Sequence, residues 1–237
     1  MTAENDLKVL ILCGGKGERL KPLTESLPKP LVKIKGRPIL SYLLTHFKSY
    51  GLEKFVIAVG YKARRMVEYF EKEHQSLQIE IVDSGDVNIV KRIKDAATCL
   101  TDDFIVSYGD TLADVNLNDL IQFHHSHSGG VTITCFPLQS QFGILETDGN
   151  DRVTSFVEKP VLDKWINIGY FYFDRCMIDQ VMAHRSFVDF LKDVAQSGNL
   201  YCYRHRGVHI TVNTIQELGE AENNIAFFEN NISGKNL

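Results

Sequence analysis

The stretch LCGGKGERLKPLTESLPKPLV, residues 12–32, concentrates glycine, proline and positive charge directly after an apolar run. Because glycine has no Cβ, the backbone N–H groups of residues 14–17 can crowd around an anion. Arg19 follows the last of these glycines by two residues, and Lys29 lies between two prolines that restrict the backbone on either side of it. A guanidinium, an ammonium on a restricted backbone and a glycine-rich turn together suit the binding of a polyphosphate.

The glycine spacing matches neither of two common nucleotide-binding motifs. The dinucleotide fingerprint G-x-G-x-x-G fails because Leu20 stands where its third glycine belongs, and the P-loop spacing G-x-x-x-x-G-K-[ST] is absent. A glycine cluster alone is also typical of an ordinary strand-to-helix turn. The prediction of a polyphosphate site therefore depends on the glycines, Arg19 and Lys29 taken together.

Neither the histidines nor the cysteines form a metal-binding pattern. His124 and His127 of the cluster His124-His125-x-His127 would share a helix face, but no matching acid or cysteine set lies nearby, so solvated histidines at a helix end are expected. The five cysteines are scattered without a CxxC pair, which favours reduced cysteines packed as small apolar residues.

Alternating elements must position these side chains. In the first half we expect strands at 7–13, 54–61, 77–83 and 103–110, and helices at 38–51, 63–74 and 90–100. Short connections between such elements imply a mostly parallel sheet covered by helices, which binds ligands beyond the carboxyl ends of its strands. The glycine-rich stretch and Asp110 both fall at that edge.

The second half is richer in strands, and no linker or repeat separates it from the first. We expect helices at 117–130, 176–183, 187–197 and from about 214, strands at 131–138, 165–174 and 200–207, and a hairpin over 142–160 that turns at Asp148-Gly149. These elements predict a single α/β domain with a mixed, mostly parallel sheet flanked by helices and a β-rich lid or substrate wall.

Composition and charge exclude several classes of function. The 237 residues are 44% hydrophobic, enough for a sizeable core, and the formal net charge of -4 gives no general attraction to nucleic acid or to an anionic membrane. No run approaches the roughly 18 apolar residues of a membrane span, and the start MTAENDLK lacks the apolar core of a secretory signal. We expect a cytoplasmic protein with neither nucleic acid nor membrane as partner.

The longer stretch LCGGKGERLKPLTESLPKPLVKIKGRPIL resembles the signature of the sugar-1-phosphate nucleotidyltransferases. The resemblance continues in VGYKARRMVEYF, YGD, FGIL, VTSFVEKP and INIGYFYF, and covers residues 7 to about 220. It implies one Rossmann-like domain over residues 1–237, with a nucleotide-binding half at about 7–115 and a sugar-phosphate-binding half at about 116–220. Such a domain transfers a nucleotidyl group to a phosphorylated substrate and releases pyrophosphate.

The resemblance also implies catalytic roles for three residues. Because two anions must approach each other, neutralising charge is the main catalytic task. Arg19 would stabilise the β- and γ-phosphates and the leaving pyrophosphate, and Lys29 the α-phosphate or the incoming phosphate. Asp110 would bind Mg²⁺, the implied cofactor, although a carboxylate before Thr111 can also serve as a helix N-cap.

Two further sets of binding residues follow from the same resemblance. The nucleotide-binding set is Leu12, Gly14, Gly15, Gly17, Arg19, Lys29, Asp83, Gly85 and Gly109. The substrate-binding set is Tyr108, Gly143, Glu158, Lys159 and Asn167. In the family pattern the glutamate contacts the sugar hydroxyls and the lysine contacts the sugar's phosphate.

One position departs from the pattern. Asn213 stands where the family places a second acidic metal ligand, so the predicted metal ligands are Asp110 and Asn213. An amide can coordinate through its carbonyl oxygen but brings no negative charge to a dication. This leaves a catalytically weak nucleotide-binding or regulatory homologue as an alternative to an active enzyme.

The base and the acceptor are less strongly indicated. YGDTLADV and IVDSG resemble the glucose-1-phosphate cytidylyltransferase branch, which favours CTP with a sugar 1-phosphate, but the branch's glycine-rich insertion before KRI is missing. GTP-using heptose-1-phosphate enzymes and cytidylyltransferases for a non-sugar phosphate or phosphonate remain alternatives. The resemblance also favours a homo-oligomer.

Overall fold

The structure, a computed structural model, describes residues 7–73 and 76–233. The amino-terminal segment that lacks a signal-like core lies mostly outside these residues. Within them, no helix is long and apolar enough to cross a membrane.

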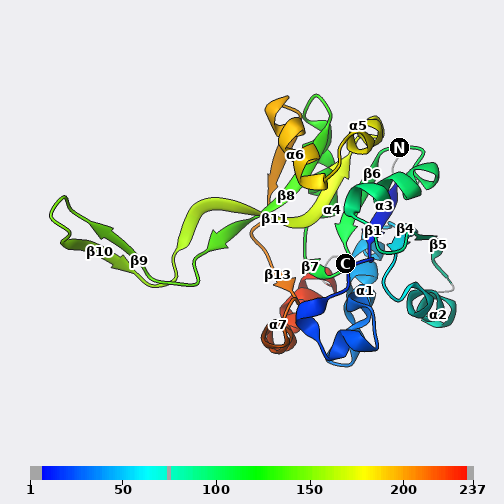
Figure 1. The fold of residues 1–237 in the computed structure, drawn as a ribbon, viewed down its shortest axis with the longest axis horizontal. Coiled ribbons are helices and arrows are strands. Elements are labelled where there is room, and N and C mark those ends of the chain that lie inside the picture. The colour runs from blue at the N-terminus through cyan, green and yellow to red at the C-terminus, as the bar shows by residue number, and fades with distance from the viewer. Residues whose placement is uncertain (1–6, 74–75, 234–237) are drawn as a thin grey trace.

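A seven-stranded sheet forms the centre of the molecule (Figure 1). Its order is β12 (Leu200–Arg204), β8 (Val131–Gln139), β11 (Val161–Phe173), β6 (Phe104–Tyr108), β1 (Lys8–Leu12), β4 (Lys54–Val59) and β5 (Gln78–Asp83). Only β11 runs against its neighbours; β12 and β8 pair in parallel, as do β6, β1, β4 and β5. The predicted mixed, mostly parallel sheet is confirmed, and strands from both halves of the chain share it.

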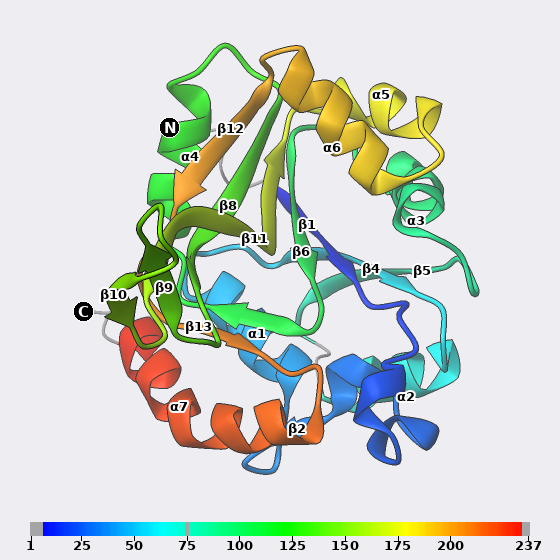
Figure 2. The ribbon, with the colours of Figure 1, turned by 60° about the vertical axis from the view of Figure 1, so that its left-hand side comes forward.

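Helices cover both faces of the sheet (Figure 2). One face packs against α1 (Ile39–Lys48), α2 (Ala63–Glu73), α4 (Leu117–His125) and α7 (Ile215–Ser233), and the other against α3 (Ile89–Ala96), α5 (Met177–Ala183) and α6 (Phe187–Gln196). The period-2 alternation of a strand explains the division, since Val9 and Ile11 of β1 join the first core and Leu10 the second. The predicted elements are thus present, with ends that differ by a few residues. The helix predicted over 117–130 already ends at His125.

The stretch between β1 and α1 contains short helices and strands that were not predicted from the sequence. Three short 3₁₀ helices follow one another, at Glu18–Leu20, Leu23–Glu25 and Lys29–Leu31, and a small pair of strands, β2 (Lys33–Ile34) and β3 (Arg37–Pro38), leads into α1. Lys29, at the start of the third of these helices, is buried.

A second small ladder joins distant parts of the chain. Strand β7 (Thr111–Ala113) directly follows β6, and it pairs antiparallel with β13 (His209–Thr211), with Thr111 opposite Thr211. The ladder brings the segment after β13 to the carboxyl end of β6.

The predicted hairpin is present as β9 (Ile144–Thr147) and β10 (Val153–Val157). Together with the adjoining ends of β8 and β11 it projects far from the body of the molecule (Figure 1). We call residues 140–161 the arm. The expected lid or substrate wall therefore does not lie over the rest of its own chain.

Candidate nucleotide-binding site

A cavity of about 580 Å³ opens at the carboxyl ends of β1 and β6. Its lining comes from the segments 12–16, 86–92, 108–110 and 186–191, together with Asn167. The volume falls within the range of roughly 300–1,000 Å³ that is common for small-molecule sites. Of the predicted site residues, Leu12, Gly14, Gly15, Tyr108, Asp110 and Asn167 line it.

Two glycines of the loop after β1 serve different purposes. A Cβ on Gly14 would lie 1.8 Å from Cζ of Arg92, so the missing side chain makes room for that guanidinium. A Cβ on Gly15 would meet nothing within 4 Å, and Gly15 is exposed on the cavity wall. Gly15 is therefore the glycine whose backbone is open to a ligand, whereas Gly14 is required by the protein itself.

Arg92 is a buried cation that the sequence did not single out. Its guanidinium donates to the carbonyls of Val59 (2.7 Å), Gly14 (3.1 Å), Gly85 (3.0 Å) and Val87 (3.0 Å). Burial lowers the pKa of Arg92 from its usual value, and nearby acids, Asp86 first, oppose the shift. One side chain thus ties the loop after β1 to the loop after β5.

The loop after β5 contains two predicted nucleotide-binding residues. Asp83 accepts a hydrogen bond from the amide of Gly85 (3.0 Å), and Gly85 adopts φ 68°, a left-handed conformation that favours glycine. Neither residue is part of the cavity lining. In the same loop Asp86, which does line the cavity, pairs with Lys16 at 2.5 Å.

Gly17 and Lys29 pack against each other beneath the loop. Gly17 adopts φ 63°, its carbonyl accepts from Thr24 Oγ1 (2.9 Å), and a Cβ there would lie 3.1 Å from Cβ of Lys29. Arg19, by contrast, is exposed in the first 3₁₀ helix and does not line the cavity. Of the two predicted basic residues, only Lys29 contacts a residue that lines the cavity, namely Asp110.

Lys29, Asp110 and Asn213 meet at one point. Lys29 Nζ donates to Asp110 Oδ2 at 2.5 Å and to Asn213 Oδ1 at 2.8 Å. The lysine is 8% exposed, so its charge is stabilised by these two oxygens rather than by water. Both predicted metal ligands therefore contact the same ammonium group, although they are 103 positions apart in the chain.

Asn213 is held in place from both sides. The β7–β13 ladder sets Asn213 beside Asp110, because Asn213 follows Thr211 by two residues and Asp110 precedes Thr111. On the other side, the backbone N–H of Asn213 donates to Glu217 Oε2 at 2.6 Å, and the backbone N–H of Glu217 donates to Thr214 Oγ1 at 3.2 Å. This reciprocal arrangement at the start of α7 is a capping pattern that fixes the backbone at Asn213.

The pair Asp110 and Asn213 fits a magnesium ion. Mg²⁺ takes oxygen ligands and is usually held by one or two carboxylates together with substrate phosphates, so one carboxylate and one amide oxygen suffice when a triphosphate completes the shell. Within the described residues, no group of three or more His, Cys, Asp or Glu side chains could hold a metal alone. A metal at this site would therefore depend on the nucleotide.

Tyr108 and Asn167 form the wall opposite the glycine loop. A Cβ on Gly169 would lie 2.5 Å from Cδ2 of Tyr108, so the absence of a side chain at Gly169 makes room for the ring beside β11. Asn167 Oδ1 accepts from the Gly169 backbone amide (2.7 Å), and the Asn167 side chain also forms a hydrogen bond with Tyr108, so the side chain is fixed at both ends. Gly109 is likewise required by packing within the protein, since a Cβ there would lie 2.6 Å from Cys13 Sγ.

The remaining predicted substrate residues lie elsewhere. Gly143, Glu158 and Lys159 are on the arm, none lines the cavity, and the last two are exposed. Gly143 and Glu158 lie close together there, because a Cβ on Gly143 would come within 3.0 Å of Glu158 Oε2. The structure does not bring these three residues to Asp110 of the same chain.

Sequence reasoning missed part of the site. Phe187, Val188 and Leu191 of α6 give the cavity an apolar wall, and Asn88 caps α3 beside it. For Arg92 a signal was present: Ile89, Arg92 and Ala96 share one helix face by their spacing, which places a charge on an otherwise apolar stripe. In the structure this arginine is buried and donates to backbone carbonyls.

His124 and His127 of the histidine cluster contact other groups of the protein. His124 is buried, contrary to the expectation of solvated histidines, with its ring nitrogens 2.9 Å from Thr132 Oγ1 and 2.8 Å from Asp174 Oδ1. Burial lowers the pKa of His124, against the opposing effect of Asp174. The cysteines are free, as expected, although Cys176 is exposed rather than packed.

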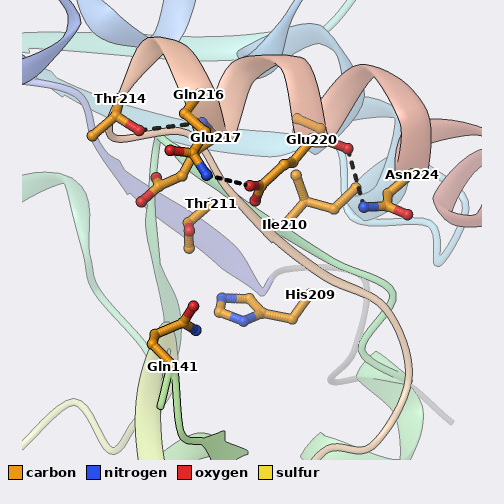
Figure 3. Close-up of a pocket in the computed structure, with 10 residues that line it drawn as sticks. Gln141, His209, Ile210, Thr211, Thr214, Gln216, Glu217, Glu220 and Asn224 are labelled. Carbon is orange, nitrogen blue, oxygen red and sulfur yellow. Dashed lines mark hydrogen bonds between the residues drawn. The ribbon is translucent and has the colours of Figure 1, made fainter. Parts of the chain in front are cut away.

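A second cavity, of about 550 Å³, lies between β13, α7 and Gln141 at the base of the arm (Figure 3). Glu217 and Glu220 project from α7 along it; the Glu220 carboxylate accepts from Gln216 Nε2 (3.0 Å), and the Glu220 backbone carbonyl accepts from Asn224 Nδ2 (3.0 Å) (Figure 3). Burial lowers the pKa of His209 to about 4, so this side chain adds no positive charge near neutral pH. No lysine or arginine is among the described residues that line this cavity, and two carboxylates without such a cation suit a triphosphate poorly.

The model of the nucleotidyl transferase family matches residues 8–223. The chain belongs to this family. The match extends over the glycine loop, Lys29, Asp110, the arm and Asn213, and confirms the resemblance that begins in residues 12–32. The protein is thus a nucleotidyltransferase.

Relatives of this nucleotidyltransferase differ in the nucleotide they are named for. The "Probable glucose-1-phosphate cytidylyltransferase" of Bacillus subtilis is 33% identical and the alignment covers 90% of this chain and 94% of that protein. The glucose-1-phosphate cytidylyltransferase of Salmonella typhi is 31% identical, with 89% and 93% covered. A mannose-1-phosphate guanylyltransferase catalytic subunit beta of Drosophila melanogaster is 31% identical, with 75% and 51% covered.

Solved structures share the fold. HddC from Yersinia pseudotuberculosis, complexed with GMP-PN, superposes with a TM-score of 0.72 at 23% identity, covering 92% of this chain and 99% of that one. At this identity the likeness establishes the Rossmann-like architecture alone. The activity class rests on the family match and on the relatives above.

Proposed function

We propose that this nucleotidyltransferase uses CTP and Mg²⁺ to convert a sugar 1-phosphate into a CDP-sugar and pyrophosphate. The observation that carries the mechanism is the meeting of Lys29, Asp110 and Asn213 at the edge of a glycine-lined cavity. The choice of CTP is supported by the two relatives that match nearly full length, both named for cytidylyl transfer to glucose 1-phosphate.

The chemistry requires charge neutralisation more than proton transfer. A phosphate oxygen of the sugar 1-phosphate attacks the α-phosphorus of the nucleotide, a new P–O bond forms, and the bond from the α-phosphorus to the oxygen bridging to the β-phosphate breaks. The attacking oxygen is already ionised, so no general base is needed. When bound, Mg²⁺ supplies positive charge for the phosphates of the nucleotide.

The protein residues have distinct proposed roles. The open backbone at Gly15 approaches the phosphates, Asp110 and Asn213 hold the metal, and Lys29 turns from these two oxygens to the α-phosphate as the anionic substrate arrives. The exposed Arg19 follows the same loop and binds the β- and γ-phosphates. Asn167 and Tyr108 face the acceptor from β11 and β6.

The test is a pyrophosphate-release screen with four nucleoside triphosphates and a panel of acceptors that includes glucose 1-phosphate, mannose 1-phosphate, a heptose 1-phosphate and a phosphonate. CTP with one sugar 1-phosphate should give the highest kcat/KM. Turnover with GTP and the heptose 1-phosphate, or with the phosphonate, would overturn the assigned base or acceptor while keeping the reaction class.

Asn213 favours a second candidate, a nucleotide-binding homologue with little activity. An amide contributes no charge to a dication, and losing one electrostatic stabiliser costs about 10²–10³ in rate in well-studied sites. If no pair of substrates turns over while CTP still raises the melting temperature, this second function is the correct one.

A further inference from the structure

We propose that the acceptor of this nucleotidyltransferase is a sugar 1-phosphate with a second acidic group, a carboxylate or a phosphate, that binds to Arg204 and Arg206 beside the nucleotide-binding cavity. The inference rests on the proposed function and names the class of acceptor. Three features of the structure lead to it. They are a row of side chains that crosses the sheet, two guanidiniums over one indole ring, and the order of the reacting groups along the row.

One row of side chains crosses five neighbouring strands. Leu12 of β1 lies opposite Tyr108 of β6, and Tyr108 is hydrogen-bonded to Asn167 of β11. Asn167 lies opposite Cys135 of β8, which in turn lies opposite Arg204 of β12. Residues opposite each other in a sheet point to the same face, and the first three of the row line the cavity. Arg204 therefore continues the cavity face two strands further, about 10 Å from Asn167 between Cα atoms.

Arg204 and Arg206 lie over a single indole ring. Their guanidinium carbons are 5.0 Å and 4.9 Å from the ring centroid of Trp165. Trp165 precedes Asn167 by two residues in a regularly paired part of β11, so it points to the same face of the sheet. The carboxyl end of β12, at Arg204, lies beside β8 near the base of the arm (Figure 2). We call Trp165, Arg204 and Arg206 the arginine patch, and it borders the cavity next to Asn167.

The backbone that carries the two arginines is anchored at the residue between them. His205 is buried, its backbone N–H donates to the Cys135 carbonyl at 2.9 Å, and its ring nitrogen Nε2 lies 3.0 Å from Asp114 Oδ1. The side chains of Arg204 and Arg206 are exposed on either side of this anchor. A cation over an aromatic face is also stabilised by the ring, so both guanidiniums have a defined position before a ligand arrives.

No acidic group neutralises the arginine patch. Within residues 7–73 and 76–233, neither guanidinium forms an ion pair or a hydrogen bond with another group of the protein. Cys135, beside Arg204 in the row, is neutral as well, because burial raises the pKa of its thiol even though the charge of Arg204 opposes the rise. The two guanidinium carbons are at most about 10 Å apart and their charges repel each other. A bound anion would remove this repulsion.

The order of the groups along the row assigns the arginine patch to the acceptor. In the proposed reaction the nucleotide phosphates lie at the glycine loop after β1, and the transfer takes place at Asp110, directly after β6. The acceptor's reacting phosphate must reach this point, so its sugar lies over Tyr108 and Asn167 and its far end points towards β8 and β12. Three strand spacings, about 14 Å, separate β6 from β12, and a sugar phosphate together with an extended arginine side chain spans this distance.

The chemistry of a guanidinium indicates what the far end of the acceptor carries. Arginine binds a carboxylate or a phosphate through two parallel, charge-assisted hydrogen bonds, which are about twice as strong as bonds between neutral groups. The hydroxyl groups of a neutral sugar would leave both positive charges without a counter-charge. A second acidic group on the acceptor therefore fits the arginine patch better than a neutral sugar does.

The test compares three acceptors that differ at one carbon of the same sugar. Glucose 1-phosphate is uncharged at C6, glucuronic acid 1-phosphate has a carboxylate there, and glucose 1,6-bisphosphate has a phosphate on C6. In a pyrophosphate-release assay with CTP and Mg²⁺, one or both acidic acceptors should have a kcat/KM about 10- to 100-fold above that of glucose 1-phosphate, mostly through a lower KM. The difference between the two acidic acceptors identifies which group the patch prefers.

Variants of the arginine patch show whether it causes the preference. In Arg204→Met and Arg206→Met the ratio of kcat/KM between the acidic and the neutral acceptor should fall to about one, whereas a purely structural role would lower both values alike. Arg204→Lys keeps the charge and should retain part of the ratio. The control is Arg64→Met, on α2 at the opposite face of the sheet with its side chain 92% exposed, which should keep the wild-type ratio.

Calorimetry without turnover separates the two proposals. With CTP and EDTA, wild type should bind an acidic acceptor at least about tenfold more tightly than glucose 1-phosphate, and Arg204→Met should not. A protein that transfers to no acceptor but shows this difference contradicts the proposed function and supports the arginine patch as an anion site. An active enzyme without a preference for either acidic acceptor, or a preference that persists in both methionine variants, overturns the inference and leaves the proposed function standing. Absence of both turnover and preferential binding contradicts both proposals.

Discussion

The guanidinium of Arg92 lies where a side chain on residue 14 would have to be. The 1.8 Å separation between a Cβ at Gly14 and Arg92 Cζ leaves no room for even a methyl group. The same guanidinium donates to carbonyls of two loops that border the cavity and to the last carbonyl of β4, so the glycine and the arginine depend on each other. Gly15, one residue on, has no such constraint.

Gly14 and Gly15 therefore offer a matched pair of variants. Gly14→Ala should displace Arg92 and lower the free energy of unfolding by roughly 1–3 kcal/mol, the usual cost of overpacking. Gly15→Ala should leave the unfolding transition nearly unchanged and raise KM for the nucleotide, because its Cβ points into ligand space. Thermal unfolding and steady-state kinetics on both variants separate the two roles. Equal loss of stability in both would contradict the assignment.

Arg92→Met should destabilise the fold through unsatisfied carbonyls. Each buried carbonyl left without a donor costs about 1–3 kcal/mol, and Arg92 donates to four carbonyls. Water can reach the carbonyls nearest the cavity once the guanidinium is gone, so the total cost is less than the sum of four. We expect a loss of roughly 2–5 kcal/mol in urea unfolding, with Arg92→Lys intermediate because an ammonium has three donors. A loss below 1 kcal/mol in Arg92→Met would show that the loops hold their shape without it.

Part of this site could be predicted from the sequence. The position of Gly15 and Asp110 at one edge follows from the strand pattern, since parallel strands bring their carboxyl ends together. The meeting of Asp110 with Asn213 could not be predicted from local pattern, because it depends on β7 and β13, two three-residue strands far apart in the chain. Only the family resemblance pointed to Asn213.

The direction of the arm is a second feature that could not be predicted from the sequence. Asp148-Gly149 between apolar runs predicts a hairpin, and the hairpin is present. The direction in which a hairpin projects depends on what its flanking strands pair with, and that long-range choice leaves no local pattern. The helix predicted over 90–100 is present as Ile89–Ala96, but burial of Arg92 depends on carbonyls from three other segments, which the local pattern does not show.

Lys29→Met should lower kcat by about 10²–10³, the effect of removing one positioned electrostatic stabiliser. The methionine keeps the length of the buried stem, so the fold should persist, and the circular-dichroism spectrum and melting temperature check this. Lys33→Met, at an exposed position four residues on, is the control and should behave as wild type. Near-normal kcat in Lys29→Met would remove Lys29 from the mechanism.

Asn213→Asp should preserve or raise activity and lower the Mg²⁺ concentration needed for half-maximal rate, because a second carboxylate adds charge beside Asp110. Titrating Mg²⁺ at saturating nucleotide measures this shift, with Asn116→Asp, at the start of α4, as a control that should not change it. A large loss of activity in Asn213→Asp would mean that the amide itself, through its contact with Lys29, has a specific task.

Asp114 links stability to pH. Burial by itself would raise the pKa of Asp114, but hydrogen bonds from His205, Asn231 and the Val208 amide outweigh it and lower the pKa to about 2. Since the folded-state pKa is below the usual value of about 3.9, the ionised carboxylate adds stability above about pH 4 that is lost as the pH falls towards 2. The difference in unfolding free energy between wild type and Asp114→Asn should therefore shrink over that interval in urea titrations. A constant difference would contradict the assigned shift.

The central claim is nucleotidyl transfer at the cavity edge formed by Lys29, Asp110 and Asn213, and pyrophosphate release from CTP and a sugar 1-phosphate measures it most directly. The account predicts Mg²⁺-dependent release that requires both substrates and falls at least about 10²-fold in a folded Asp110→Ala variant. Release by Asp110→Ala at the wild-type rate, or none by the wild type with any nucleotide and sugar 1-phosphate, would contradict it.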